Sequence, residues 1–365
     1  MTTQNTGNFF EDFAVGVTLR HAVPRTVHGG DLSLYIGFTG DRRPLHSSTE
    51  FARSLGYVRE VVHDLLVFHI VFGKSVDDIS LNATANLGYA DVRFIRPVYP
   101  GDTLRAESEI VGLRETSKGN AGIVYVKTRG FNQKDAEVLS FYRWVLVPKR
   151  DKDAISGMGE VPTLPTEVAV ADIPVPEALN LERFEDLMWA TGGVKLWEDF
   201  TPGQRIHHPG GMTIDQVDSG SATRLYQNTA RVHFDAYAMK SSRFGKRLVY
   251  GGHVISVAHA LSYTGLENVL AMSAWNGGVH ANPVFGGDTI YAFTDVLACA
   301  KLPGRRDVAA LRLRLVAVKD ADPSSEQIEL PELSSPAKKK YDPRIVLDLD
   351  YWGLIPCKPE LPKAA

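Results

Sequence analysis

The octapeptide PVYPGDTL at residues 97–104 recurs as PVFGGDTI at residues 283–290, an offset of 186 positions. A heptapeptide behaves in the same way, because FEDFAVG at residues 10–16 is answered by WEDFTPG at residues 197–203, an offset of 187. Two matches that lie far apart in the chain and share almost the same offset are typical of a tandem duplication. We therefore expect the 365 residues to fold as two copies of one structural unit.

A proline-rich stretch separates the two copies. Residues 149–178 are rich in proline, valine and acidic side chains, and the prolines are too frequent for a helix or for a central strand. This composition favours an extended linker. We predict a first domain over residues 1–150, a linker over residues 151–190 and a second domain over residues 191–365.

Each copy combines one helical pattern with several strand patterns. Residues 61–73 and 252–265 are apolar runs that contain no interior proline and end at a glycine, as helices often do. Runs rich in β-branched and aromatic residues follow, at residues 103–113, 122–131 and 138–147 in the first copy and at residues 289–297, 308–318 and 345–351 in the second. A helix that precedes antiparallel strands, twice over, predicts the α+β class.

The composition excludes several classes of protein. Hydrophobic residues make up 44% and charged residues 23% of the chain, which excludes a collagen-like, coiled-coil or largely disordered protein. A net charge of −3 provides no positive field for binding a nucleic acid or an anionic membrane. Cys299 and Cys357 have neither C-x-x-C nor zinc-ligand spacing, so we expect no structural disulfide. Residues 1–10 lack a signal-peptide pattern and no long apolar run occurs, so we expect a cytoplasmic protein without a membrane partner.

One loop motif carries residues suited to acid–base chemistry. In GDRRPLH, residues 40–46, Asp41 precedes His46 by five positions, and adding 187 leads to Asn228 and His233 in QNTARVHFD. An acid or amide and a histidine on one loop can hold a water molecule between them, and such groups serve as general acids and bases. A lone motif of this kind is most often a simple turn. Its repetition at the common offset makes these four residues the candidate catalytic residues.

The same motif carries a resemblance to a known family. The G-D-x-x-P-x-H spacing, a short helix expected over residues 48–55 and the PGDTL stretch resemble the MaoC-like (R)-specific enoyl-CoA hydratases, whose fold is the hot dog. Longer stretches are similar to the mesaconyl-CoA hydratase branch of that family, namely NFFEDF, VFHIVFGKSV, SLNATANLGYA, TRLYQNTARVHF, RFGKRLVYGGHVIS and NPVFGGDTIYA. The resemblance covers nearly the whole chain. It implies a tandem hot dog, in which two antiparallel sheets, each wrapped around a central helix, join into one surface with both helices on one face.

This resemblance implies an enzyme. Its reaction would be the reversible hydration of an enoyl-CoA thioester, mesaconyl-CoA to β-methylmalyl-CoA, with coenzyme A as part of the substrate and with no metal or other cofactor. It also implies a homo-oligomer, with a dimer as the expected form. Two other functions stay open at this point. A hot-dog thioesterase would direct water at the thioester carbonyl carbon instead, and a non-catalytic module would only bind acyl-CoA.

The family's enolate-binding group distinguishes the two copies. In the family, the glycine that opens the central helix donates its backbone N–H to the enolate oxygen. Gly252, preceded by Gly251, matches this glycine in the second copy, whereas Asp64 takes the corresponding place in the first. A carboxylate beside a developing enolate would oppose the reaction. We therefore predict that the second copy is the working one.

The second copy nevertheless lacks a carboxylate in its loop motif. Asn228 can orient a water molecule but cannot accept its proton, so His233 would transfer the proton alone or with Asp235. Tyr226 and Arg231 lie beside this motif and are candidate substrate-binding residues. A dicarboxylic acyl group would also need a cation, and guanidinium groups bind carboxylates well. The sequence offers six arginines without choosing among them: Arg93, Arg96, Arg224, Arg231, Arg243 and Arg247.

Overall fold

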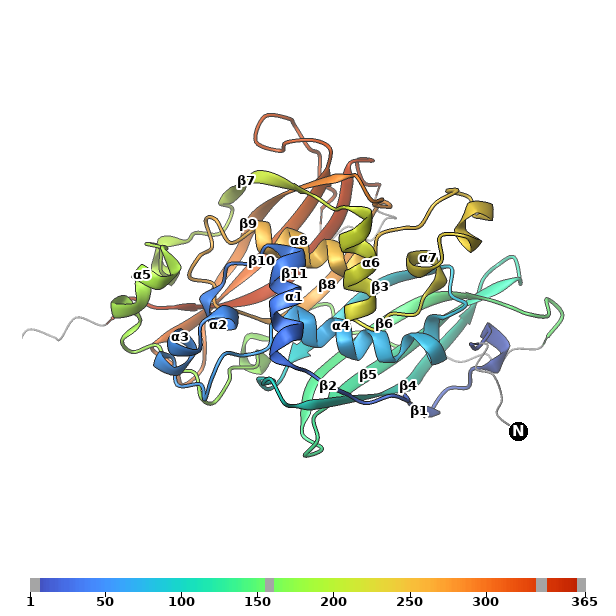
Figure 1. The fold of residues 1–365 in the computed structure, drawn as a ribbon, viewed down its shortest axis with the longest axis horizontal. Coiled ribbons are helices and arrows are strands. Elements are labelled where there is room, and N and C mark those ends of the chain that lie inside the picture. The colour runs from blue at the N-terminus through green and yellow to red at the C-terminus, as the bar shows by residue number, and fades with distance from the viewer. Residues whose placement is uncertain (1–6, 155–160, 333–339, 360–365) are drawn as a thin grey trace, which may run out of the picture.

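One continuous antiparallel sheet forms the core of the protein. The computed structural model describes residues 7–154, 161–332 and 340–359, and its sheet has eleven strands within these ranges (Figure 1). The first copy supplies β1 (Thr18–Arg20), β2 (Arg25–Thr26), β3 (Ala85–Phe94), β4 (Thr103–Glu115), β5 (Ala121–Phe131) and β6 (Glu137–Pro148). The second copy supplies β7 (Arg205–Thr213), β8 (Ala271–His280), β9 (Thr289–Lys301), β10 (Val308–Lys319) and β11 (Ile345–Pro356).

The two copies meet at the centre of this sheet. The strands lie in the order β1-β4-β5-β6-β3-β8-β11-β10-β9-β7, with β2 attached to β4. β3 of the first copy pairs antiparallel with β8 of the second, in a register that sets Tyr89 opposite Gly278 and Arg93 opposite Ala274. Backbone hydrogen bonds therefore link the two copies into a single surface. The predicted α+β class and the joined tandem sheets are confirmed.

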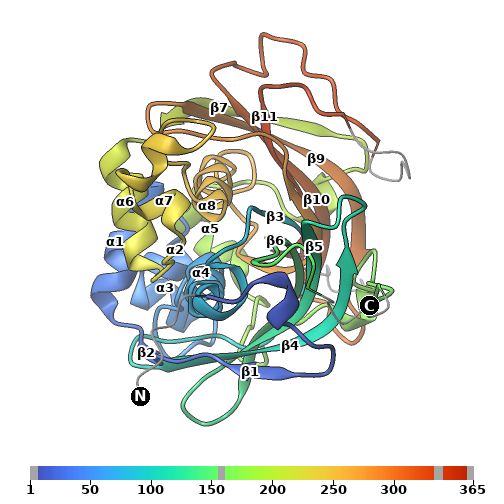
Figure 2. The ribbon, with the colours of Figure 1, turned by 90° about the vertical axis from the view of Figure 1, so that its right-hand side faces the viewer.

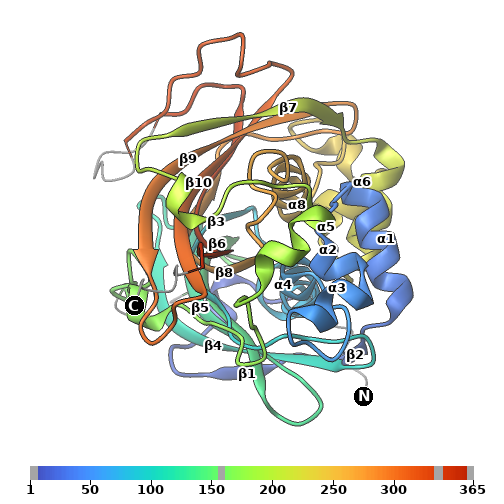
Figure 3. The ribbon, with the colours of Figure 1, turned by 90° about the vertical axis from the view of Figure 1, so that its left-hand side faces the viewer.

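Both central helices lie on one face of the sheet, which curves around them (Figures 2 and 3). They are α4 (Asp64–Lys74) and α8 (Gly251–Leu261), and the sequence patterns located both with ends a few residues off. The two helices touch at matching positions, since His69 Nε2 lies 2.7 Å from Ser256 Oγ and 256 − 69 = 187. An approximate two-fold axis that relates the copies therefore passes near this contact.

Other helices cover the outer side of the central pair (Figure 2). α1 (Gly29–Thr39) contacts α6 (Gln216–Leu225) and also contacts α8, so the central helices are enclosed between the sheet and this outer layer. The other helical elements are α2 (Pro44–Ser47), α3 (Thr49–Ser54), α5 (Met188–Thr191), α7 (Arg231–Phe234) and the short turns η1 (Phe10–Asp12), η2 (Val76–Ser80), η3 (Val170–Asp172), η4 (Phe184–Leu187), η5 (Trp197–Asp199) and η6 (Ala238–Ser241). No helix in the described ranges is long and apolar enough to cross a membrane.

The repeated sequence motifs form matching turns in the two copies. Asp12 and Asp199 each accept a hydrogen bond from the backbone N–H three residues earlier, at 2.9 and 3.0 Å, beside a 3₁₀ turn. In the repeated octapeptide, Asp102 and Asp288 likewise accept the backbone N–H three residues earlier, at 2.8 and 3.0 Å. Asp102 and Asp288 each follow a glycine with a positive φ, a conformation that other residues rarely adopt. The matches that reveal the duplication are thus structural turns.

The linker packs against the second copy. Val168 and Ile173 are buried, and Val168 donates its N–H to Asn276 Oδ1 at 2.8 Å. Ser273 donates its hydroxyl to the carbonyl oxygen of Pro174. These contacts attach the linker to β8, so it is more than an extended spacer. Residues 155–160 of the predicted linker lie outside the described residues, and the domain limits stay a prediction.

Candidate active site

A cavity of about 290 Å³ lies between the two copies, beside the start of α8. Its lining from the second copy includes both predicted catalytic residues and their neighbours: Asn228, His233, Tyr250, Gly251 and His280. The first copy also contributes lining residues, among them Phe72, Ser80, Asn86, Tyr89 and Arg143. Both copies are therefore needed to build this cavity.

His233 lies in α7 with its ring held by one backbone hydrogen bond. Its Nδ1 is 3.0 Å from the carbonyl oxygen of Leu248, and because a carbonyl only accepts, Nδ1 carries the hydrogen. Nε2 of the neutral ring therefore carries the lone pair. Burial lowers the pKa of His233 to about 4, which keeps the ring neutral near pH 7. The ring can thus accept a proton from a water molecule in the cavity.

Asn228 is fixed by its own turn. Its Oδ1 accepts the N–H of Ala230 at 3.0 Å, and the residue is buried. The residue lines the same cavity as His233, so the two predicted partners are brought together at one site. An amide there can orient a water molecule, while the proton transfer is left to the histidine.

The N-terminus of α8 borders the cavity at Gly251. The first N–H groups of a helix have no carbonyl partner within the helix and carry partial positive charge. A Cβ on Gly251 would lie 2.6 Å from the ring of His280, so a larger residue would have to displace that ring. Gly252, which the family resemblance favours as the donor, is buried outside the cavity lining, and a Cβ there would lie 2.5 Å from the ring of Tyr250. Because Gly251 lines the cavity, its N–H is the candidate group for stabilising an enolate oxygen.

His280 connects this site to the first copy. Its Nε2 lies 3.2 Å from the hydroxyl oxygen of Tyr89. Burial, with a smaller effect of His233, lowers the pKa of His280 to about 4, so both cavity histidines are neutral near pH 7. Sequence reasoning missed His280 because it ends β8, a strand whose sequence gave no clear strand pattern.

In the first copy, Asp41 forms a buried ion pair with Arg43. Its Oδ1 accepts the backbone N–H of Arg43 at 2.8 Å, and its Oδ2 accepts the Arg43 guanidinium Nη1 at 2.6 Å. Burial alone would raise the pKa of Asp41, but Arg43 and His63 hold it well below its usual range. Asp41 is therefore a buried counter-ion, and its bonds go to Arg43 rather than to His46.

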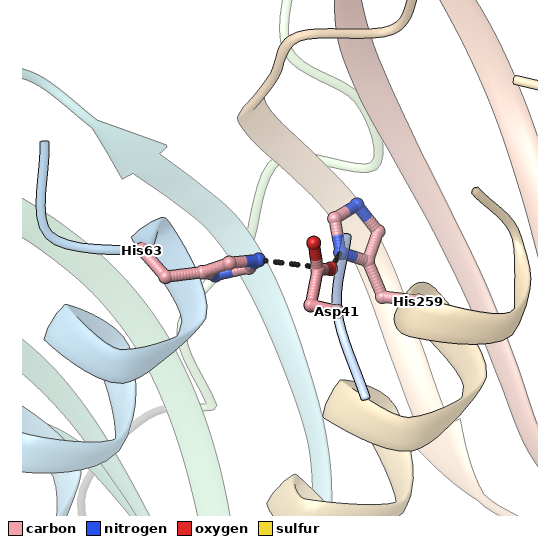
Figure 4. A group of neighbouring side chains, drawn as sticks. All are labelled: Asp41, His63 and His259. Atoms are coloured by element: carbon pink, nitrogen blue, oxygen red, sulfur yellow. Dashed lines mark hydrogen bonds and ion pairs between the residues drawn. The ribbon is translucent and has the colours of Figure 1, made fainter. Parts of the chain in front are cut away.

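Two histidines complete this buried cluster (Figure 4). His63 Nε2 lies 3.4 Å from Asp41 Oδ2, and His259 Nδ1 lies 3.8 Å from the same oxygen. The three side chains have the types and spacing of metal ligands. The guanidinium of Arg43 already bonds to that carboxylate oxygen, and its charge would repel a cation there. The cluster is therefore better suited to holding the fold together than to binding a metal ion.

His46 has the same backbone hydrogen bond as His233, with Nδ1 3.0 Å from the carbonyl oxygen of Val61. The surrounding space differs, however. The cavity at the start of α4 measures only about 20 Å³ and is lined by Asp64 and by Pro176 of the linker. Asp64 accepts the N–H of Met272 at 3.1 Å, and burial raises its pKa to about 6. This cavity is too small for an acyl chain.

Two predicted binding residues, Tyr226 and Arg231, do not line the cavity. Tyr226 is buried behind Tyr250, with 5.9 Å between the ring centroids, and its hydroxyl lies 3.2 Å from His253 Nδ1. Arg231 is exposed at the start of α7. Among the six arginines that the sequence offered, Arg243 lines the cavity. Arg143 lines it as well, although sequence reasoning did not consider it.

Known proteins resemble this chain over almost its full length. The family model for mesaconyl-CoA hydratase matches residues 1–325. The β-methylmalyl-CoA dehydratase of Chloroflexus aurantiacus is 50% identical over 352 residues, which cover 96% of this chain and 98% of that protein. A solved structure from the same organism, described as a MaoC-domain dehydratase, has a TM-score of 0.90 at 48% identity and covers 98% of this chain and 100% of that chain.

A more distant structure agrees on the architecture. A Mycobacterium tuberculosis protein with a double hot-dog fold has a TM-score of 0.77 at 24% identity, covering 96% of this chain and 99% of that one. At this identity the likeness concerns the fold alone. The family match and the identity of the nearer relative go further, and they show that the chain belongs to the mesaconyl-CoA hydratase family.

Proposed function

We propose that this chain is a hydro-lyase that reversibly adds water to mesaconyl-CoA, giving β-methylmalyl-CoA, in the cavity beside His233. Family membership supports the reaction and the acyl group. Coenzyme A enters as part of the substrate, and the cavity residues supply the acid–base chemistry themselves. The choice of site rests on one observation, that a half-buried and neutral His233 and the N-terminus of α8 border the same cavity.

The reaction can be written with groups of the second copy. A water molecule held between Asn228 and His233 gives a proton to Nε2 of His233 while its oxygen bonds to the β-carbon of the enoyl group. The electrons of the double bond move to the thioester oxygen, and the N–H of Gly251 stabilises the resulting enolate. His233 then transfers its new proton to the α-carbon, which restores the neutral ring. Dehydration follows the same steps in reverse.

The first copy has a different task in this proposal. Its carboxylate, Asp41, is already neutralised by Arg43, and Asp64 stands where the second copy has the glycine that opens α8. The difference between cavities of about 20 and about 290 Å³ supports the same division. The first copy therefore supplies a wall of the acyl pocket, while the second copy performs the chemistry.

A product assay tests the proposed reaction. Mesaconyl-CoA should lose its enoyl-thioester absorbance on incubation with the protein, and crotonyl-CoA assayed in parallel should react much more slowly. Release of free thiol from a saturated acyl-CoA would indicate a thioesterase instead. Binding of CoA esters without turnover of mesaconyl-CoA would indicate a non-catalytic module. Either of these results would contradict the proposal.

The pH dependence follows from the state of His233. We expect kcat/KM to stay constant from about pH 8 to about pH 5.5 and to fall at lower pH, because only the neutral ring accepts a proton. The pKa of this ring is lowered to about 4, whereas an ordinary histidine would titrate near 6.5. A pH–rate profile measures this directly. An inflection near pH 6.5 would show that an unshifted histidine is the base.

Folding has to be monitored along the same pH range. Burial also lowers the pKa values of His46 and His208, to about 3 and about 4. The unfolded chain binds protons to such residues below about pH 6.5 while the folded chain does not, so stability falls as the pH decreases. Circular dichroism at each pH separates this loss from titration of the catalytic group.

Replacing the glycine at the start of α8 tests the enolate-binding group. Gly251→Ala should lower kcat by about 100- to 1000-fold, because the new Cβ would lie 2.6 Å from the His280 ring and would shift the N–H from its position. Gly37→Ala in α1 is the matched control, since a Cβ there meets no atom within 4 Å. Steady-state rates of both variants give the comparison. A folded Gly251→Ala protein with nearly normal kcat would contradict this role.

A further inference from the structure

We infer that Arg143 binds the free carboxylate of the substrate and thereby selects a dicarboxylic acyl group, an inference that rests on the proposed function. Arg143 belongs to β6 of the first copy, is fully buried and lines the cavity that holds His233. The first copy would thus supply the specificity of a reaction that the second copy catalyses.

The partners of Arg143 are all uncharged. Its Nη2 donates to Ser75 Oγ at 2.8 Å and its Nη1 donates to Ser80 Oγ at 3.3 Å. The guanidinium carbon lies 4.2 Å above the ring of Phe72, and the buried Nε has no hydrogen-bond partner. Burial lowers the pKa of Arg143 to about 10, so the group remains charged near pH 7. Within the described part of the chain, no carboxylate lies within ion-pair distance of this charge.

Other buried arginines are neutralised by aspartates. Arg43 lies 2.6 Å from Asp41, and Arg314 lies 2.8 Å from Asp348. A buried charge without a counter-ion is costly, because the protein interior replaces the water that would otherwise solvate it. Arg143 therefore differs from these residues in a way that an anionic ligand would correct.

Two further polar groups in the same cavity lack partners. Both amide atoms of Asn86 are buried without a hydrogen bond, and so is the hydroxyl oxygen of Tyr250. Asn86 lies on β3, the neighbour of β6, where Tyr89 pairs with Arg143. An amide N–H, a phenolic O–H and a guanidinium are all donors, and a carboxylate accepts from each. The lining of the cavity is thus complementary to a small anion.

A chain of packed aromatic rings connects Arg143 to His233. Arg143 packs on Phe72, whose ring lies 5.6 Å from that of Tyr250, which in turn lies 5.5 Å from the ring of His233. Mesaconyl is a methylfumaryl group, so its free carboxylate is attached to the β-carbon, the atom that receives the hydroxyl. A carboxylate held by Arg143 would therefore place that carbon near the water on His233.

Two substrates of similar shape test this assignment. In 2-methylcrotonyl-CoA a methyl group replaces the carboxylate of mesaconyl-CoA. Arg143→Met should lower kcat/KM for mesaconyl-CoA by at least about 100-fold, because the carboxylate loses its buried counter-ion. The same variant should keep the kcat/KM of the parent for 2-methylcrotonyl-CoA within about threefold, and Arg143→Lys should fall between parent and variant on mesaconyl-CoA.

The matched control is Arg243→Met. Arg243 lines the same cavity but is exposed, so its loss should leave the ratio of the two kcat/KM values unchanged. An equal loss on both substrates in a folded Arg143→Met protein would overturn the inference and leave the proposed function intact. A parent protein that hydrates 2-methylcrotonyl-CoA but not mesaconyl-CoA would overturn the proposed function itself.

A second variant covers the case in which Arg143→Met does not fold. Asn86→Ala should raise KM for mesaconyl-CoA and not for 2-methylcrotonyl-CoA. Its melting temperature should be unchanged or higher, because the buried amide has no partner to lose. An unchanged KM for mesaconyl-CoA in this variant would count against a carboxylate site at this end of the cavity.

Discussion

His233→Gln is expected to lower kcat for mesaconyl-CoA hydration by about 100- to 10,000-fold, the usual range for loss of a general acid–base residue. Glutamine can still donate an N–H to the carbonyl oxygen of Leu248, so the loop should keep its shape. It has no basic nitrogen, however, and cannot take the proton of the attacking water. Initial rates of absorbance loss under substrate saturation give kcat for the variant and the parent.

The duplication provides a matched control for this substitution. His46 is buried, lies 187 positions earlier and makes the same bond to a backbone carbonyl, that of Val61. His46→Gln should therefore perturb the fold in the same way while leaving kcat within a few-fold of the parent. A large loss in His46→Gln with normal turnover in His233→Gln would move the active site to the first copy.

Asp41→Asn is expected to destabilise the protein by about 3 to 5 kcal/mol, the usual result of removing one partner of a buried ion pair. Arg43 is 2% exposed, and its guanidinium would face an amide that cannot neutralise it. Urea unfolding measures the change in the free energy of unfolding. At a temperature where the variant is folded, kcat should stay within a few-fold of the parent, because the proposed reaction uses groups of the second copy.

An exposed ion pair serves as the control for this stability measurement. Asp186 lies 2.6 Å from Arg183, and both side chains are largely exposed. Asp186→Asn should therefore change the free energy of unfolding far less than Asp41→Asn, since water solvates the remaining charge. A folded and stable Asp41→Asn protein that has lost hydration would contradict the structural role of Asp41.

The duplication and the two candidate loops could be located from the sequence because their residues lie at fixed offsets. Asp12 and Asp199 close the same turn, so the sequence match reports a real structural equivalence. His233 could be inferred in the same way, from its alignment with His46. The different sizes of the cavities in the two copies could not be inferred, because they depend on how the linker and Asp64 pack in three dimensions.

The strands that join the copies were missed for a physical reason. β3 reads ANLGYADVRF, which contains asparagine, glycine and aspartate, residues that are uncommon in strands. Asp91 has a positive φ of 47°, and the pairing with β6 shifts register between Ala90 and Arg93. Such an irregular strand lacks a regular alternation of buried and exposed residues, so its central place in the sheet results from tertiary contacts.

The sequence of β6 contains a signal that distinguishes Arg143. Along β6, Phe141, Arg143, Val145 and Val147 occupy alternate positions and are all buried. A charged residue in the inward phase of an otherwise apolar strand is unusual, because a buried charge needs a partner. Arg143 is absent from the six arginines named from the sequence, although its phase in the strand distinguishes it.

The central claim is that one site per chain, in the second copy, binds and hydrates the acyl group. A crystal structure of the His233→Gln variant with mesaconyl-CoA tests it most directly, since the substrate should survive there. We expect the thioester oxygen at the N–H of Gly251 and the free carboxylate at Arg143, with the linker in its place over Asp64. An acyl group lying between His46 and Asp64, with Pro176 displaced, would contradict the account.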